Sequence, residues 1–542
     1  MSVGDHTRFD REFDRRYAYG GCDLGAVCTP DRTVFKLWSP EASGVELFLY
    51  RHDTAGPWFD RRPLELGDRG VWSCTVEGDL HGVYYDYEVT VRGETALTAD
   101  PYAVACGRNG RRSMAADLAR TDPKGFDRDG APPLPPENII YELHVKDFSY
   151  HPDSGVPEEC RGRFGAFAWR DGQGRLPLCM EHLKGLGVTH VQLLPIYDFG
   201  SVDEEGDGSQ FNWGYDPVNY NVPEGSYSTD PADGAARIRE CKEMVQALHE
   251  NGMRVVMDVV YNHTYTADSW LERSAPGYYY RRWADGSLSN GSGCGNDIAA
   301  GRAMADNYIV HSVLYWAKEY HIDGFRFDLM GLLTVELMNR IQRALDAAFG
   351  RGEKLVYGEP WRAADSPMED SAPLLDPSVA MFCDVTRDAI KGDCFHCEQP
   401  GFVNGGVGLG ETILCAAAGW MGGVGDFKPR ACSQVINYVS AHDNYTLWDK
   451  LALCSPGPGG AVCYQEPRDD LLAQNRLAAF VCFTCQGNLF LQAGEEFART
   501  KLGDHNSYKS PPEVNCLDWH RAWTFGTLSD YYRCLLYTSP SP

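Results

Sequence analysis

Two charged residues in the middle of the chain, Arg326 and Asp328, have the spacing of a catalytic pair. They lie in Gly324–Gly331 (GFRFDLMG), which reads as a short strand running into a loop. Because side chains alternate across a strand, Arg326 and Asp328 share one face while Phe325 and Phe327 take the other. A guanidinium nearby favours the ionised carboxylate, and an ionised, oriented aspartate can act as a covalent nucleophile. Taken alone, the octapeptide is more often a strand-end salt bridge.

Three further polar segments follow apolar runs: Asp258–His263 (DVVYNH), Tyr357–Trp361 (YGEPW) and Val439–Asn444 (VSAHDN). Each alone is typical of a loop ion pair or a turn. Together with Arg326 and Asp328 they supply four carboxylates, two histidines and an arginine. At the carboxyl ends of the strands of one barrel they would surround a single pocket, which is where enzymes of that architecture place their chemistry.

Residues 137–533 are predicted to form a (β/α)8 TIM barrel, the α/β fold that would position these segments. Apolar runs alternate with helical stretches such as Ala235–Glu250 and Met304–Tyr320, as in a parallel sheet built from βα units. Segment 264–303, after the third strand, is too long for an ordinary connection and should fold over the barrel mouth as a lid or small subdomain. The predicted strands number eight, as barrel closure requires: Ile139–Val145, Val188–Leu194, Met253–Val260, Gly324–Leu329, Lys354–Tyr357, Val379–Cys383, Val435–Ser440 and Asn488–Gln492.

The chain before the barrel divides into three parts. Residues 1–20 form a charged arm that we expect to be poorly structured. Residues 21–120 contain short runs of β-branched and aromatic residues broken by Gly, Pro and Asp, which predicts a small all-β sandwich. Residues 121–136 are rich in Pro, Gly and Asp and are predicted to be a linker. Aromatic residues of the sandwich could stack on sugars, although each is more often part of a core: Trp38, Trp58, Trp72, Tyr85 and Tyr87.

Composition narrows the classes of partner. The chain has 542 residues, 50 of them basic and 76 acidic, with a net charge of −26, which argues against nucleic acid and anionic membranes as partners. Its 19 cysteines lack framework spacing, no basic-then-apolar leader opens the sequence, and no apolar run has the length of a membrane span. We therefore expect a cytoplasmic monomer of two or three domains with reduced thiols.

Together the four polar segments resemble the signature regions of the α-amylase clan of glycoside hydrolases (family 13). Phe211–Pro217 (FNWGYDP) resembles a motif of type I pullulanases, and Asp504–Tyr508 (DHNSY) with Leu517–Trp519 is similar to a downstream segment of that subfamily. The sandwich, with Asp23–Ala26 and Phe35–Trp38, resembles the starch-binding-type module of family 48. The resemblance covers about residues 15–533 and departs mildly at Lys509 and Pro512, where the family favours Asn and Asp.

This resemblance implies retaining hydrolysis of α-1,6 branch linkages in pullulan, amylopectin, glycogen or limit dextrins. Asp328 would be the nucleophile, Glu359 the general acid/base, and Asp443 a third carboxylate that stabilises the transition state. His263 and His442 would donate hydrogen bonds to the reacting sugar. Tyr215 would stack beneath the ring of that sugar. Arg326 and Asn444 would also bind substrate. Trp213 and Trp361 would do so as well, unless they serve packing alone. Asp258 and Asn262 would support these residues.

The expected partner is a branched α-glucan, and no metal or organic cofactor is implied for the reaction. Some family members bind structural calcium, but no Asp-rich loop here marks a site. An isoamylase-like or glycogen-debranching hydrolase of the same clan is the nearest alternative. A branching enzyme and a non-catalytic, truncated glucan-binding fragment are the others.

The last nine residues, Cys534–Pro542, show no helical pattern and match a translated sequencing-library adapter. We expect residues 534–542 to be a non-native tail and the natural sequence to stop near Arg533. On that expectation the barrel is incomplete at its carboxyl end, without its last helix and without the further β-domain that follows the barrel in the family.

Overall fold

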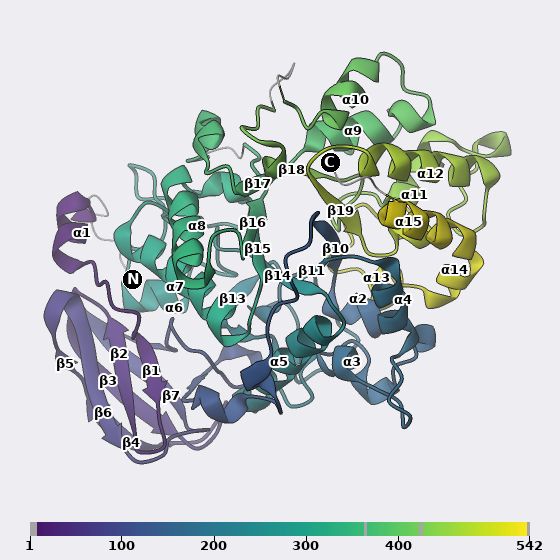
Figure 1. The fold of residues 1–542 in the computed structure, drawn as a ribbon. Coiled ribbons are helices and arrows are strands. Elements are labelled where there is room, and N and C mark those ends of the chain that lie inside the picture. Colours follow the sequence, from purple (N-terminus) through teal and green to yellow (C-terminus); the bar gives the residue numbers. More distant parts are fainter. Residues whose placement is uncertain (1–7, 363–365, 422–426, 539–542) are drawn as a thin grey trace.

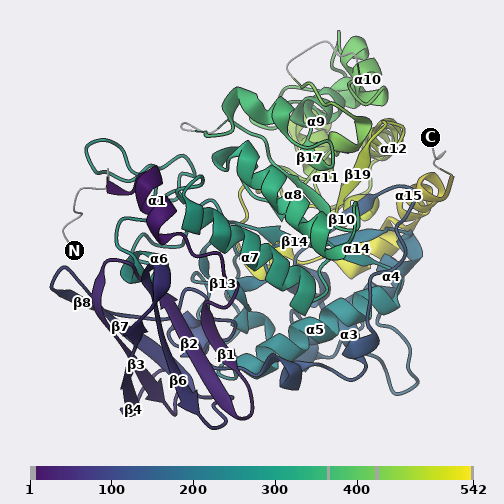
Figure 2. The ribbon, with the colours of Figure 1, turned by 60° about the vertical axis from the view of Figure 1, so that its left-hand side comes forward.

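The computed structural model describes residues 8–362, 366–421 and 427–538. A β-sandwich formed by the first part of the chain lies beside a parallel barrel, as Figure 1 shows from one side and Figure 2 from another. The predicted fold class, a TIM barrel preceded by a small sandwich, is confirmed. None of the described helices is at once long and apolar enough to cross a lipid bilayer.

The sandwich has two antiparallel sheets, with strand orders β1-β2-β6-β5 and β4-β3-β7-β8, and β9 pairs with β7. Of the five aromatic residues considered for sugar stacking, Trp38, Trp72, Tyr85 and Tyr87 are buried and belong to the core. Trp58 on β4 is 50% exposed. The strands are β1 (Gly25–Cys28), β2 (Arg32–Trp38), β3 (Ala42–Tyr50), β4 (Trp58–Pro63), β5 (Glu65–Leu66), β6 (Val71–Glu77), β7 (Tyr84–Val91), β8 (Glu94–Thr98) and β9 (Ser113–Met114).

The amino-terminal arm contains a helix, α1 (Arg11–Tyr17), so the expectation of poor structure is wrong there; residues 1–7 lie outside the described chain. Asp10 caps the helix by accepting hydrogen bonds from the next turn, which satisfies amides that would otherwise lack partners. Phe9, just before the cap, and Phe13, within the helix, both pack against Tyr278. A short helix such as this is stable only when another element covers its apolar side chains.

Eight parallel strands follow one another around the barrel in sequence order, and β10 pairs with β19 to close it. All eight predicted strands are confirmed. Most end earlier than predicted, and the residues that follow them begin the connections that carry the site. The strands are β10 (Ile139–Leu143), β11 (His190–Leu193), β14 (Arg254–Val259), β15 (Gly324–Phe327), β16 (Leu355–Gly358), β17 (Val379–Phe382), β18 (Val435–Asn437) and β19 (Asn488–Gln492).

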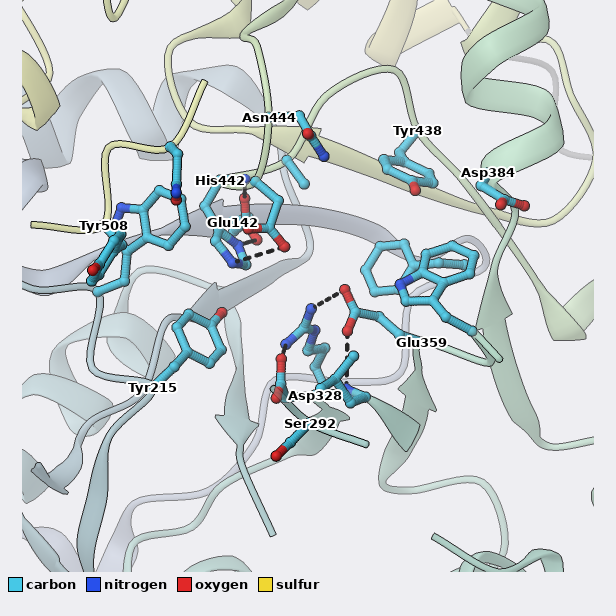
Figure 3. Close-up of a pocket in the computed structure, with 18 of the residues that line it drawn as sticks. Glu142, Tyr215, Ser292, Asp328, Glu359, Asp384, Tyr438, His442, Asn444 and Tyr508 are labelled. Carbon is cyan, nitrogen blue, oxygen red and sulfur yellow. Dashed lines mark hydrogen bonds and ion pairs between the residues drawn. The ribbon is translucent and has the colours of Figure 1, made fainter. Parts of the chain in front are cut away.

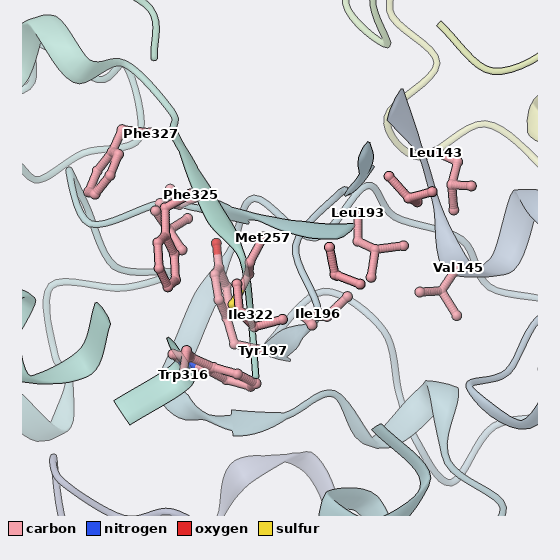
Figure 4. Close-up of a cluster of buried hydrophobic side chains, with 14 of the residues drawn as sticks. Leu143, Val145, Leu193, Ile196, Tyr197, Met257, Trp316, Ile322, Phe325 and Phe327 are labelled. Atoms are coloured by element: carbon pink, nitrogen blue, oxygen red, sulfur yellow. The ribbon is translucent and has the colours of Figure 1, made fainter. Parts of the chain in front are cut away.

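Helices surround the strands, and alternation along each strand separates two apolar layers. Phe325 and Phe327 on β15 point outward to a cluster that includes Trp316, shown in Figure 4. Each buried phenylalanine contributes about 1.5–3 kcal/mol through the apolar surface it removes from water. This packing fixes the orientation of β15 and so aims the intervening Arg326 into the barrel. The main outer helices are α4 (Leu178–Leu186), α5 (Gly234–Glu250), α7 (Ala303–Glu319), α8 (Val335–Phe349), α9 (Asp384–Lys391) and α12 (Asp469–Phe483).

A further helix, α15 (Gly526–Thr538), follows the last strand and packs against α4 and α12. The expectation that the barrel lacks its final helix is therefore wrong. The helix also runs beyond Arg533 through Thr538, so the prediction of no helical structure after residue 533 is wrong for the described part of the tail. Residues 539–542 lie outside it.

The excursion 264–303 connects the sandwich to the barrel mouth. Its helix α6 (Trp270–Ser274) touches β8, and the Ser39 hydroxyl donates to the carbonyl of Ser274 at 2.6 Å. Further along, Ser292 and Cys294 line the pocket at the mouth. The segment is thus a wall of the pocket that is backed by the sandwich, in agreement with the expected placement at the barrel mouth.

A buried charge network fastens the linker to the floor of the barrel. His249 Nε2 lies 2.8 Å from Asp323, and His249 Nδ1 lies 3.0 Å from Asp129 of the linker. His321 contacts Asp129 at 2.7 Å, and Lys354 contacts Asp323 at 3.1 Å. Burial opposes the charge of His249, but hydrogen bonds to the two aspartates raise its pKa to about 9.

Replacing His249 with Gln is expected to lower the thermal unfolding midpoint at pH 6, where the charged ring contributes on the order of 2–3 kcal/mol. The folded pKa of about 9 exceeds the unfolded value, so the contribution is complete below pH ~6.5 and is lost as the pH rises through 9. Scanning calorimetry at pH 6 and pH 10 should show a large difference from wild type at pH 6 only. An exposed histidine, His520→Gln, is the control. Equal differences at both pH values would contradict the assignment.

Candidate active site

A cavity of about 1050 Å³ opens at the carboxyl ends of the barrel strands. Ten of the twelve predicted site residues line it. The other two, Asp258 and Asn262, lie directly behind the wall and contact lining residues. The ten predicted residues that line the cavity are Asp328, Glu359, Asp443, Tyr215, His263, Arg326, His442, Trp213, Trp361 and Asn444.

Arg326 is the hub of the pocket floor. Its Nη1 lies 3.0 Å from Asp258 Oδ1 and 3.1 Å from Asp328 Oδ1, and its Nη2 lies 2.6 Å from Glu359 Oε1. Although burial opposes the charge, the carboxylates of Asp258 and Glu359 raise the pKa of Arg326 above its ordinary value. Burial raises the pKa of Asp258 to about 7 in spite of Arg326. A planar guanidinium with several donors suits this role, because it can bind more than one carboxylate at once.

Asp328 is held by two partners and remains open to the cavity. Asn262 donates from Nδ2 to Asp328 Oδ2 at 2.7 Å and to the Asp328 carbonyl at 2.9 Å. Arg326 binds the other carboxylate oxygen, and the side chain keeps 14% of its exposure. The next residue, Leu329, has a φ of 41°, in the left-handed region that a leucine rarely adopts. The chain therefore turns sharply where the strand ends.

That turn points the Leu329 amide at Glu359, which accepts from it at 2.9 Å. Figure 3 shows Glu359 between this amide and the Arg326 guanidinium. Burial, reinforced by Asp328 and Asp443, raises the pKa of Glu359 above its ordinary value. The carboxylates of Asp328 and Glu359 thus bind different nitrogens of the Arg326 guanidinium and line the same cavity. This arrangement is compatible with the separation of about 5–5.5 Å in retaining glycosidases.

An aromatic wall stands opposite the two carboxylates. Tyr215 stacks on the His442 ring with centroids 5.0 Å apart and planes inclined at 18°, and its hydroxyl donates to Asp258 at 2.8 Å. Trp213 meets His442 edge-on at 4.8 Å and is only 5% exposed. Trp213 therefore supports the His442 ring as well as lining the cavity. The Asp443 side chain, at the rim, is 55% exposed, with Oδ2 3.7 Å from His442 Nε2.

The two predicted histidines differ in their surroundings. His263 Nε2 lies 2.9 Å from the Tyr215 carbonyl and Nδ1 lies 2.6 Å from Asn262 Oδ1. Both of its ring nitrogens thus contact the protein, and burial lowers its pKa. His442 differs, because its Nε2 lies 3.7 Å from Oδ2 of Asp443, and both residues line the cavity. A hydrogen bond from His263 to sugar stays a prediction.

Several lining residues escaped the sequence analysis. Glu142 and Asp384 follow or end barrel strands, so the strand-end rule used for the four signature segments could have found both. Asn506 and Tyr508 lie in a segment noted only for its resemblance. Tyr438 directly follows β18, so the same rule could have found it, and Arg387 and Lys391 lie on α9. Ser292, Cys294 and Phe395 come from connections whose path a sequence does not reveal.

Within the part of the chain that the structure describes, one acidic group has the geometry of a cation site: Asp198, Glu204 and Glu224. The guanidinium of Arg237 lies in this group, 3.2 Å from Asp198 and 2.6 Å from Glu204. The arginine already supplies the positive charge that these buried carboxylates need. The group lies apart from the cavity lining.

Comparisons with known proteins find relatives of both the sandwich and the barrel. Residues 23–103 match the family model described as carbohydrate-binding module 48 (isoamylase N-terminal domain). Residues 177–290 match the model described as alpha amylase, catalytic domain. The solved pullulanase of Paenibacillus barengoltzii, in complex with maltohexaose and α-cyclodextrin, is 43% identical and superposes with a TM-score of 0.92 over 99% of this chain and 84% of that one. That of Anoxybacillus sp. LM18-11 with maltotetraose is 38% identical, with a TM-score of 0.88 over 97% and 76% of the two chains.

Relatives known by sequence carry similar names. A Bacillus subtilis pullulanase is 39% identical, and the match covers 97% of this chain and 72% of the relative. Pullulanase 1 of Arabidopsis thaliana is 32% identical over 93% and 61% of the two chains. Isoamylase SU1 of Zea mays is more distant, 27% identical over 97% and 75%.

Proposed function

The chain belongs to the pullulanase family, and we propose on this basis that it is a retaining glycoside hydrolase that cleaves α-1,6 branch linkages in α-glucans. One observation carries the proposal beyond the family name. Arg326 binds both Asp328 and Glu359 at the floor of an open cavity large enough for several sugar units. An ionised nucleophile beside a carboxyl group whose pKa is raised is the division of labour that retaining glycosidases need.

In the first step, an Asp328 oxygen attacks the anomeric carbon while the protonated Glu359 gives its proton to the leaving O6. The glycosidic C–O bond breaks as the bond from carbon to Asp328 forms. In the second step, Glu359, now ionised, takes a proton from water, whose oxygen displaces Asp328 from the anomeric carbon. We expect Asp443 and Tyr215, which line the same cavity, to stabilise the positive charge that develops on the sugar ring.

The placement of Asn262 supports the assignment of Asp328 as nucleophile. Asn262 and Arg326 occupy different oxygens of the carboxylate, which fixes its orientation toward the cavity before substrate binds. Preorganisation of this kind lowers the barrier, because the groups need no reorganisation during the reaction.

The test is a comparison of pullulan with glycogen as substrates of the purified protein. We expect maltotriose as the product of pullulan, because hydrolysis of its α-1,6 bonds alone releases that trisaccharide. Reducing-end assays and product chromatography measure it. Debranching of glycogen without release of maltotriose from pullulan would instead favour the isoamylase-like alternative. Chain transfer with no gain in reducing ends would favour a branching enzyme.

A further inference from the structure

Glu142, at the end of the first barrel strand, binds His442 with both of its carboxylate oxygens. Oε1 lies 2.7 Å from the ring Nδ1, and Oε2 accepts from the His442 backbone amide at 2.7 Å. Glu142 is 2% exposed, and Gln192 Nε2 reaches Oε1 from below at 3.4 Å. Figure 3 shows Glu142 next to His442. The carboxylate therefore fixes both the ring and the loop that carries it.

We propose that Glu142 is a positioning residue that keeps His442 protonated on both ring nitrogens, so that Nε2–H is a fixed donor for a sugar hydroxyl beside Asp443. The inference rests on the proposed function, since it names the group that orients a substrate contact of the same site. Glu142 itself is 2% exposed, and both of its carboxylate oxygens are engaged by His442.

The charged groups around His442 decide its protonation. Asp443 adjoins it, 3.7 Å from Nε2, and Asp258 on β14, behind the wall of the pocket, interacts with it electrostatically. Arg326 on β15 opposes a positive ring, and Lys501, whose Nζ donates to the His442 carbonyl at 2.9 Å, is a further basic group, although burial lowers its pKa to about 8. Burial also disfavours the charged ring, yet Glu142 and Asp443 raise the pKa of His442 to about 9.

A second histidine of the same barrel shows the effect of burial without such a partner. His190 begins β11, is 2% exposed, and its ring contacts the Thr189 hydroxyl at 2.9 Å. Burial lowers the pKa of His190 to about 4. The contrast indicates what His442 would become without the carboxylate at Nδ1.

The protonation state matters because of the tautomer that Glu142 enforces. With a carboxylate as acceptor, Nδ1 must carry a proton. A neutral His442 would then have a lone pair on Nε2, directed at the Asp443 carboxylate and unable to donate to a hydroxyl. Only the doubly protonated ring offers a donor to the cavity. Its stack on Tyr215 and edge contact with Trp213 hold that donor in place.

The experiment measures maltotetraose binding by calorimetry from pH 5 to pH 10 in a Glu359→Gln background. This background slows any turnover by about 10²–10⁴-fold and removes the titration of the catalytic acid. We expect its affinity to fall as the pH rises through 9. In Glu142→Gln/Glu359→Gln, the amide has one oxygen for two donors and no charge, so the midpoint should shift down by about two pH units or more. Glu142→Asp/Glu359→Gln retains the charge and should restore most of the shift.

The inference is overturned if the Gln and Asp variants share one midpoint, because a merely structural role would affect affinity equally at all pH values. If Glu142→Gln fails to fold, His442→Gln/Glu359→Gln decides: the alkaline loss of affinity should vanish, and its persistence would overturn the inference.

The control is Glu495→Gln/Glu359→Gln, whose midpoint should be unshifted. Glu495 is buried and accepts a hydrogen bond from the Ser440 hydroxyl at 2.6 Å, and it does not line the cavity. No binding by Glu359→Gln alone at any pH would overturn the proposed function together with the inference.

Discussion

Replacing Asp328 with Asn should lower kcat on pullulan by a factor on the order of 10⁴ or more. The amide fits the same space and can still accept from Arg326, but it cannot form a covalent glycosyl intermediate. Because the substrate contacts of the aromatic wall are untouched, KM should change far less than kcat. Steady-state rates of reducing-end release measure both constants.

Asp376→Asn is the matched control for this variant. Asp376 also lies next to a barrel strand, but at the opposite end, where it accepts from the Ser378 hydroxyl at 2.6 Å. It should retain pullulan hydrolysis. If Asp328→Asn kept even a tenth of the wild-type kcat with no trace of contaminating wild type, Asp328 would not be the nucleophile.

Replacing Glu359 with Gln should lower kcat/KM on pullulan by about 10²–10⁴-fold, the usual contribution of general acid–base catalysis. The loss should be much smaller on α-maltotriosyl fluoride, because fluoride departs with little need for a proton. The rate of fluoride release compared with that of reducing-end release separates the two effects. Equal losses on both substrates would mean that Glu359 does not protonate the leaving group.

The pH profile gives an independent check on the same residue. The acid must be protonated at the start, so wild-type kcat/KM should fall as the pH rises through the pKa of Glu359. Burial raises that pKa, and the fall should therefore lie above the ordinary value for glutamic acid, about 4.3. In Glu359→Gln this alkaline decline should disappear. A decline at unchanged pH in that variant would assign it to another group.

Much of the site was predictable because strand periodicity and strand-end position are local properties. The alternation in Gly324–Gly331 correctly separated Arg326 and Asp328 from the outward-facing phenylalanines. The eight apolar runs correctly predicted the eight strands of the barrel. Position in the fold then placed four segments, distant in sequence, around one cavity. The rule that site residues lie at strand ends also applies to Glu142. The other residues of its strand are apolar or aromatic, and nothing near Glu142 in the sequence indicates its partner His442, which lies 300 residues further along the chain.

What the sequence could not supply depends on contacts between distant segments. The helix of the amino-terminal arm exists because Phe9 and Phe13 find Tyr278 to pack against, and nothing in residues 1–20 alone reveals that surface. The close packing of Trp213 on His442 likewise depends on how two loops meet above the barrel. Local pattern predicts elements well, whereas the orientation of a side chain within a wall is set by its neighbours in space.

The wall formed by the excursion has a consequence for how the molecule can be divided. Trp38 of the sandwich packs against Tyr278 of the excursion, with ring centroids 4.8 Å apart, and Arg273 reaches the carbonyl of Leu97. A protein engineer who excised the first hundred residues would strip the backing from this wall and leave Tyr278 facing water. The family 48 module thus supports the wall of the cavity, and its deletion should be judged by the shape of the cleft that it leaves behind.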